Sequence, residues 1–143
     1  VDKDFPVHRA QALHLLQEEA ELNEIVQLVG VDGLSKTDRL KLETCQMIRE
    51  DYLHQNAFHE IDTYSSTNKQ FKMLDLILRY YKEAVRGVEG GVEFNKLAAL
   101  PVREEIGRFK YLTEDKVDDS YADIVNKMES TVSDLIKEAG DAE

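Results

Sequence analysis

The sequence predicts an all-α protein, a helical bundle of about five to six helices that opens with an antiparallel helical hairpin. Three observations support this fold class. Apolar residues recur at helical spacing through most of the chain, glycine, proline and capping residues divide that pattern into segments, and no segment alternates like a β-strand. Because 42% of the 143 residues are apolar, a single domain of this size can bury a core.

The first two helices are predicted on either side of a short glycine-bounded turn. Pro6 suits the first turn of a helix that ends at Gly30. Ser35 is placed to cap a second helix, with Asp38 three residues later, and this helix should end near Gln55. Because the turn is so short, the two helices must fold back on each other and expose it. The apolar stripe of the first helix comprises Ala12, Leu15, Leu16, Leu22, Ile25, Val26 and Val29.

Residues 1–143 are predicted to form a single domain. Residues 1–64 should contain the hairpin and a loop, and three segments follow them: a third helix over residues 65–86, a linker with short helices over 87–112, and a C-terminal helix over 113–140. The glycine-rich RGVEGGVEFN matches no phosphate-binding motif, so we interpret it as a flexible linker. The expected stripes are Phe71, Leu74, Leu78, Tyr81 and Val85 in the third helix, and Val117, Tyr121, Ile124, Val125, Met128, Val132, Leu135 and Ile136 in the last.

The composition argues against several classes of function. A net charge of −11 disfavours direct binding to nucleic acid or to an anionic membrane surface, because both require basic patches. No run of about 18 apolar residues is present, and the N-terminus lacks the apolar segment of a signal peptide, so we expect no direct membrane insertion. The lone Cys45 has no partner for an intramolecular disulfide, which suggests a reducing compartment and a small buried packing residue.

No catalytic or metal-binding constellation stands out. His54 and His59 lie near two carboxylates, but their spacing does not match HExxH, in which both histidines share one helix face. His8 and His14 are also without evident partners, and we expect all four histidines to be solvated. Paired carboxylates fall on helix faces that are normally solvated, and no nucleophile motif accompanies them. The residues therefore predict neither a catalytic site nor a metal site.

Four separated motifs, LLQEEAEL, VGVDGLS, MIREDYL followed by QNAFHE, and LPVREEIGR, occur in an order that resembles the C-terminal helical domain of the catalytic A subunit of archaeal and bacterial V/A-type ATP synthases. The resemblance covers essentially the whole chain. It implies an upstream P-loop domain, non-catalytic B subunits and central-stalk subunits as partners, and a cytoplasmic location at the periphery of the cell membrane, in the soluble head of the complex.

The resemblance also sets expectations for activity and cofactors. No counterpart of the Walker lysine or of the catalytic glutamate is present, so we expect this chain alone to be no enzyme and to hold no cofactor. The full-length subunit would bind ATP or ADP with Mg²⁺ and would couple ATP hydrolysis or synthesis to H⁺ or Na⁺ transport.

Two segments gain expected roles from the resemblance. The hairpin tip matches the acidic DELSEED element of the related F-type catalytic subunit, which looks like a lever against the rotor. Few carboxylates remain there and a lysine accompanies them, so a steric push by a stiff two-helix arm is the better physical account. The expected rotor-contact residues are Asp32, Gly33, Leu34, Ser35, Lys36 and Asp38. QNAF matches one side of the adenine pocket, formed by Gln55, Asn56, Ala57 and Phe58.

Two alternatives stay open at this point. Phe58 could simply be buried beneath its loop, which the residue alone would favour, whereas the resemblance places its ring against the adenine base. The whole chain could instead be a free-standing acidic helical module that binds a basic helical partner.

Overall fold

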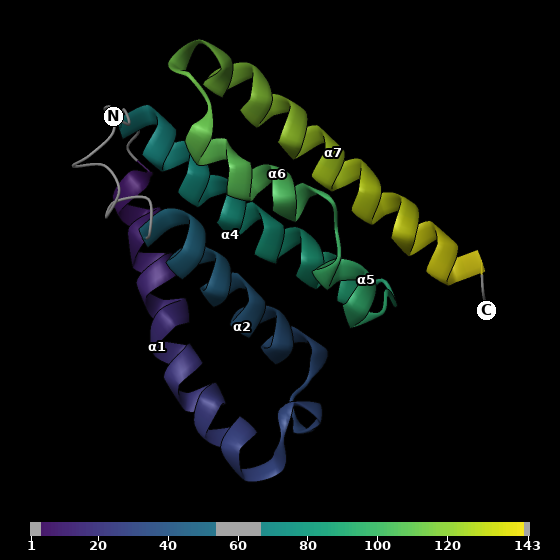
Figure 1. Cartoon of the computed structure of the whole chain (residues 1–143). Coiled ribbons are helices and arrows are strands. Elements are labelled where there is room, and N and C mark those ends of the chain that lie inside the picture. Colours follow the sequence, from purple (N-terminus) through teal and green to yellow (C-terminus); the bar gives the residue numbers. More distant parts are fainter. Residues whose placement is uncertain (1–3, 54–66, 142–143) are drawn as a thin grey trace.

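The structure is a computed structural model that describes residues 4–53 and 67–141, and within these ranges the chain is all-α, which confirms the predicted fold class (Figure 1). No helix in these ranges combines the length and apolar character needed to cross a membrane. The elements in chain order are α1 (Phe5–Val29), the 3₁₀ turn η1 (Val31–Gly33), α2 (Lys36–Met47), the π-helical segment η2 (Ile48–Leu53), α4 (Thr67–Glu89), α5 (Phe94–Ala98), α6 (Val102–Arg108), the 3₁₀ turn η3 (Phe109–Tyr111) and α7 (Glu114–Asp141).

Helices α1 and α2 form the predicted hairpin, and its boundaries follow from local chemistry. Pro6 lies in the first turn of α1, and Gly30 ends that helix with φ 81° and ψ 166°, a conformation essentially restricted to glycine. Ser35 caps α2 because its hydroxyl oxygen accepts a hydrogen bond of 3.1 Å from the backbone N–H of Asp38. The predicted end of α1 at Gly30 and the predicted cap of α2 at Ser35 are therefore confirmed, whereas the predicted end of the second helix near Gln55 lies outside the described residues.

Helix α4 is the centre of the bundle. It contacts α1 and α2 on one side and α6 and α7 on the other, so more than one of its faces is buried. Its fully buried side chains are Met73, Leu74, Leu76, Ile77, Tyr80 and Ala84. The predicted stripe of α4 was therefore incomplete: Leu74 is buried, but Phe71, Leu78, Tyr81 and Val85 are only half-buried. A stripe of one helical period cannot describe a helix with neighbours on both sides.

The glycine-rich segment that we interpreted as a flexible linker is a packed turn. Helix α4 continues to Glu89, so Gly87 is a helical residue rather than the start of a linker. A Cβ atom on Gly87 would lie 2.7 Å from Cδ2 of Leu97, and one on Gly90 would lie 2.7 Å from Cγ1 of Ile136. The absence of side chains at these glycines therefore lets α5 and α7 approach the end of α4.

Helix α7 covers α4 with the predicted apolar face. It begins at Glu114, directly after Thr113, and runs parallel to α4, because Tyr121 lies against Asp75 and Ile136 lies against Gly90 (Figure 1). Val117, Ile124, Met128 and Val132 are buried, and the other predicted members of the stripe are half-buried against the core: Tyr121, Val125, Leu135 and Ile136. This amphipathic prediction is confirmed.

Candidate functional site

The hairpin of α1, η1 and α2, which we call the arm, projects beyond the rest of the bundle (Figure 1). We call residues 25–38 the arm tip. Of the expected rotor-contact residues, Asp32, Gly33, Ser35 and Lys36 are exposed, and Asp38 is half-buried. Leu34 differs, because its side chain is turned inward and only 9% exposed. The arm tip thus brings most, but not all, of the predicted set to the surface.

The charged residues of the arm tip are largely neutralised within the protein. Nζ of Lys36 lies 3.7 Å from a carboxylate oxygen of Glu93, and Asp38 lies 3.6 Å from Nζ of Lys41. Asp32 is exposed at the end of the hairpin. Exposed ion pairs of this kind contribute little free energy, so the arm tip has a weak electrostatic character.

Apolar side chains dominate the exposed surface of the arm tip. The exposed fractions are 42% for Ile25, 84% for Leu28, 62% for Val29 and 43% for Val31. Sequence reasoning placed Ile25 and Val29 on the inward stripe and assigned no role to Leu28. The stripe fails here because the chain opposite the end of α1 is the short turn η1 and the polar start of α2. The sequence did contain one indication of this exposed apolar surface, namely a run of apolar residues beside a glycine turn.

Helices α1 and α2 are joined along the arm by both apolar and polar contacts. Cys45 is fully buried and its thiol donates a hydrogen bond of 3.2 Å to the backbone carbonyl of Leu15, which confirms the predicted packing role. Burial raises the pKa of this thiol to about 12. Nζ of Lys41 lies 2.8 Å from Glu18, and their hydrogen bond lowers the pKa of Glu18 and raises the pKa of Lys41. Arg49 also pairs with Glu19.

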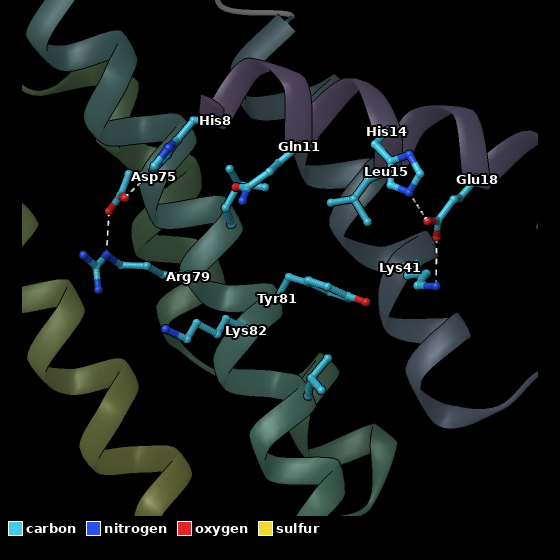
Figure 2. Close-up of a pocket in the computed structure, with 12 residues that line it drawn as sticks. His8, Gln11, His14, Leu15, Glu18, Lys41, Asp75, Arg79, Tyr81 and Lys82 are labelled. Atoms are coloured by element: carbon cyan, nitrogen blue, oxygen red, sulfur yellow. Dashed lines mark hydrogen bonds and ion pairs between the residues drawn. The ribbon is translucent and has the colours of Figure 1, made fainter. Parts of the chain in front are cut away.

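A groove of about 710 Å³ lies between α1 and α4, with Lys41 of α2 near one end (Figure 2). Leu78, Tyr81 and Val85, three members of the predicted α4 stripe, contribute to its apolar lining. Their partial exposure is explained by this groove, because α1 does not cover them. We call the opposite end of the groove, where α1 begins, the arm root.

The arm root is built around the carboxylate of Asp75, which is 7% exposed (Figure 2). It accepts hydrogen bonds from Nε2 of His8 at 2.7 Å, from Nε of Arg79 at 2.6 Å and from the hydroxyl of Tyr121 at 2.5 Å. Burial raises the pKa of Asp75, but the three hydrogen bonds together hold it below its ordinary value. Burial and the bond to Asp75 raise the pKa of Tyr121 to about 12. Asp75 is therefore a buried carboxylate with a complete set of donors.

The expected solvated state of the histidines is wrong for His8. Its ring lies 5.0 Å from the ring of Phe71 and it is ion-paired with Asp75. His14 is exposed but pairs with Glu18 at 2.6 Å. No pattern in the sequence indicates the His8 contact, because the two residues lie 67 positions apart.

Residues 1–97 match the family described as the C-terminal domain of V and A type ATP synthase. The chain belongs to this family. Similar proteins include the V-type ATP synthase alpha chains of Acetivibrio thermocellus, with 52% identity over 136 residues, and of Clostridioides difficile, with 51% identity over 140 residues. A third, from Clostridium perfringens, is 52% identical over 140 residues.

The comparisons cover nearly all of this chain but only a fraction of each relative. The matches span 95% of this chain and 23% of the Acetivibrio thermocellus protein, and 98% of the chain and 24% of each of the other two. The chain therefore spans about a quarter of the length of these V-type ATP synthase alpha chains.

The residues expected to contact adenine, Gln55, Asn56, Ala57 and Phe58, lie outside the described residues of this family member, as do His54 and His59. Their roles stay predictions. Within the ranges 4–53 and 67–141, no three His, Cys, Asp or Glu side chains form a group that could hold a metal ion. Within the described residues, the candidate functional features are therefore the apolar arm tip and the hydrogen-bonded arm root.

Proposed function

We propose that this chain is the mechanical C-terminal domain of the catalytic subunit of a rotary V/A-type ATP synthase, coupling closure of an upstream nucleotide site to rotation of a central stalk. The domain would act within the soluble head of the complex, on the cytoplasmic side of the membrane, beside non-catalytic B subunits. ATP or ADP with Mg²⁺ would bind in the full-length subunit. That subunit would hydrolyse or synthesise ATP, and this reaction would be coupled to H⁺ or Na⁺ transport.

The observation that carries this proposal is the projecting arm with its exposed apolar tip. Leu28 is 84% exposed near the end of α1, and its neighbours Ile25 and Val29 are exposed as well. Such a surface is typical of a contact with another macromolecule rather than of a free solvated turn. A contact that slides during rotation also favours apolar and steric interactions, because an ion pair holds one geometry and has a preferred register. The stalk surface facing the tip is therefore expected to be apolar.

The arm itself has the construction that a lever requires. Two helices transmit a push when they cannot slide past each other, and here apolar packing is combined with the Lys41–Glu18 pair and the Cys45–Leu15 hydrogen bond. The charges of the tip are already engaged with Glu93 and Lys41, which leaves little charge for pulling on a partner. Steric pushing is thus the mechanism that these contacts support.

The proposal is tested by placing a charge on the tip in the assembled complex. Leu28→Glu should lower ATP-driven ion transport at least about tenfold, because a carboxylate desolvated in an apolar contact costs several kcal/mol. Leu13→Glu is the matched control, since Leu13 lies on the same helix, is 57% exposed and is remote from the tip. Melting temperatures of both variants should match that of the parent. Equal transport by the two variants would contradict the lever.

For the nucleotide end, we propose that Phe58 stacks on adenine and that Gln55, Asn56 and Ala57 shape the backbone beside it. Phe58→Ala in the full-length subunit should weaken nucleotide binding by about 1–3 kcal/mol, the usual contribution of one stacked base. Phe58→Tyr retains the stacking face and is the control. Unchanged nucleotide affinity with a lowered melting temperature would assign Phe58 to the core instead.

A further inference from the structure

Asp75 has a position that the lever proposal does not use. The donors to its carboxylate come from three helices: His8 from α1, Arg79 from α4 and Tyr121 from α7. A buried carboxylate is tolerated only when its charge is compensated in this way, and removing one partner of such a group is costly. The carboxylate therefore ties the first turn of the arm to α4 through His8 (Figure 2) and also binds α7 through Tyr121.

His8 contacts its partners through both ring nitrogens. Nε2 lies 2.7 Å from Asp75, and Nδ1 lies 3.0 Å from the backbone carbonyl oxygen of Asp4. The contact with Asp75 holds the His8 ring to α4, and the contact with Asp4 holds it within the start of α1.

The arm root is also a place where α1 packs directly against α4. Phe5 packs against Phe71 with ring centroids 5.5 Å apart, next to the His8–Asp75 pair. Toward the tip, the groove of about 710 Å³ separates the exposed side of α4 from α1. The direction of the arm relative to α4 is therefore determined at the root and through α2, and not along the groove.

We propose that Asp75 is a positioning residue that fixes the direction of the arm by binding His8 of α1 and Tyr121 of α7 at the same carboxylate. A force applied at the tip then moves the bundle as one body, instead of bending the arm at its root. The first half of this inference concerns the domain alone, whereas its second half rests on the lever function proposed above.

The first half is tested on the 143-residue chain by hydrogen–deuterium exchange. His8→Gln and Asp75→Asn should each increase exchange of the amides in the first turns of α1 on the order of tenfold, with α4 and α7 much less affected. His14→Gln is the matched control, because His14 also pairs with a carboxylate on α1 but its side chain is 71% exposed. Tyr121→Phe, which keeps the ring, should give a smaller increase. Equal exchange in His8→Gln and His14→Gln would overturn the assignment.

The second half is tested by the coupling ratio, ions transported per ATP hydrolysed, in the assembled complex carrying His8→Gln. A lowered ratio with increased exchange at the root supports the whole inference. Increased exchange with an unchanged ratio retains Asp75 as the positioning residue and counts against its mechanical consequence. Unchanged exchange, in a complex where Leu28→Glu abolishes transport, overturns the positioning role and leaves the lever intact.

Discussion

Two turns of this molecule contain a glycine with positive φ, yet they have opposite environments. Gly30, with φ 81°, begins the exposed turn at the arm tip, and a Cβ atom there would meet nothing within 4 Å. Gly91, with φ 89°, lies in the turn after α4, where Gly87 and Gly90 press against α5 and α7. In the second turn the N–H of Val92 donates to the carbonyl of Gly87 at 2.9 Å, and Val92 is 2% exposed.

The comparison separates what a glycine turn does for the backbone from what it does for packing. At the tip, glycine is needed only for the direction of the chain, so the neighbouring side chains are free to meet a partner. After α4, the same kind of turn is part of the core, because small residues allow helices to come close. Similar local chemistry therefore serves an exposed contact in one place and a packed junction in the other.

The largest expected effect comes from filling the packed turn. Gly87→Val should lower the free energy of unfolding by about 3 kcal/mol, because the new side chain would overlap Leu97, which is fully buried in the core. Urea denaturation of the chain measures this loss. Gly140→Val, in α7 with nothing within 4 Å, is the control and should change stability by less than about 1 kcal/mol. Similar losses in both variants would show that packing does not distinguish the sites.

A smaller loss is expected at the open turn. Gly30→Ala should cost about 2 kcal/mol through backbone strain alone, because φ 81° with ψ 166° is a conformation that other residues avoid. The same urea titration applies. Gly140→Ala, at a helical position, should instead be neutral or slightly stabilising. A neutral Gly30→Ala would mean that the turn adopts another conformation at little cost.

These two turns also show how far the sequence alone predicts the molecule. Gly30, Ser35 and Pro6 mark helix ends by local chemistry, and all three were predictable from the residues. The packing of Gly87 was not, because it depends on α5 and α7 meeting the end of α4 after the chain has folded. Asp75 was missed for the same reason: a single carboxylate on a helix gives no sign of donors that lie 67 and 46 residues away.

The apolar arm tip was predictable from the sequence only in part. The periodicity of α1 predicted its inward face through Leu22, but it could not show where the opposite helix ends. Ile25 and Val29 continue the stripe in sequence but are 42% and 62% exposed in the fold. The proposed contact surface lies where the apolar stripe of α1 extends beyond the helix that packs against it. Only the arrangement of the helices shows where this happens.

The cap of α2 provides the next smaller effect and tests the rigidity of the exposed turn. Ser35→Ala should reduce the free energy of unfolding by about 1 kcal/mol, because the N–H of Asp38 loses its acceptor. Ser35→Asp retains an acceptor and is the matched control. Thermal or urea unfolding of the three proteins measures the difference, and equal stability of Ser35→Ala and Ser35→Asp would indicate that the cap contributes nothing.

The smallest effect is expected for substitution of Asp32. If this substitution has no effect on ion transport, that result supports the steric lever. Asp32→Asn keeps the shape of the exposed turn and removes its charge, so stability should change by less than about 0.5 kcal/mol. If the tip pushes sterically through Leu28 and its apolar neighbours, ion transport by the complex should also stay within about fivefold of the parent, since an exposed ion pair contributes at most about 1 kcal/mol. Asp32→Lys reverses the charge and measures the electrostatic contribution directly. A large loss of transport in Asp32→Asn, with Leu28→Glu tolerated, would replace the steric lever by an ionic one.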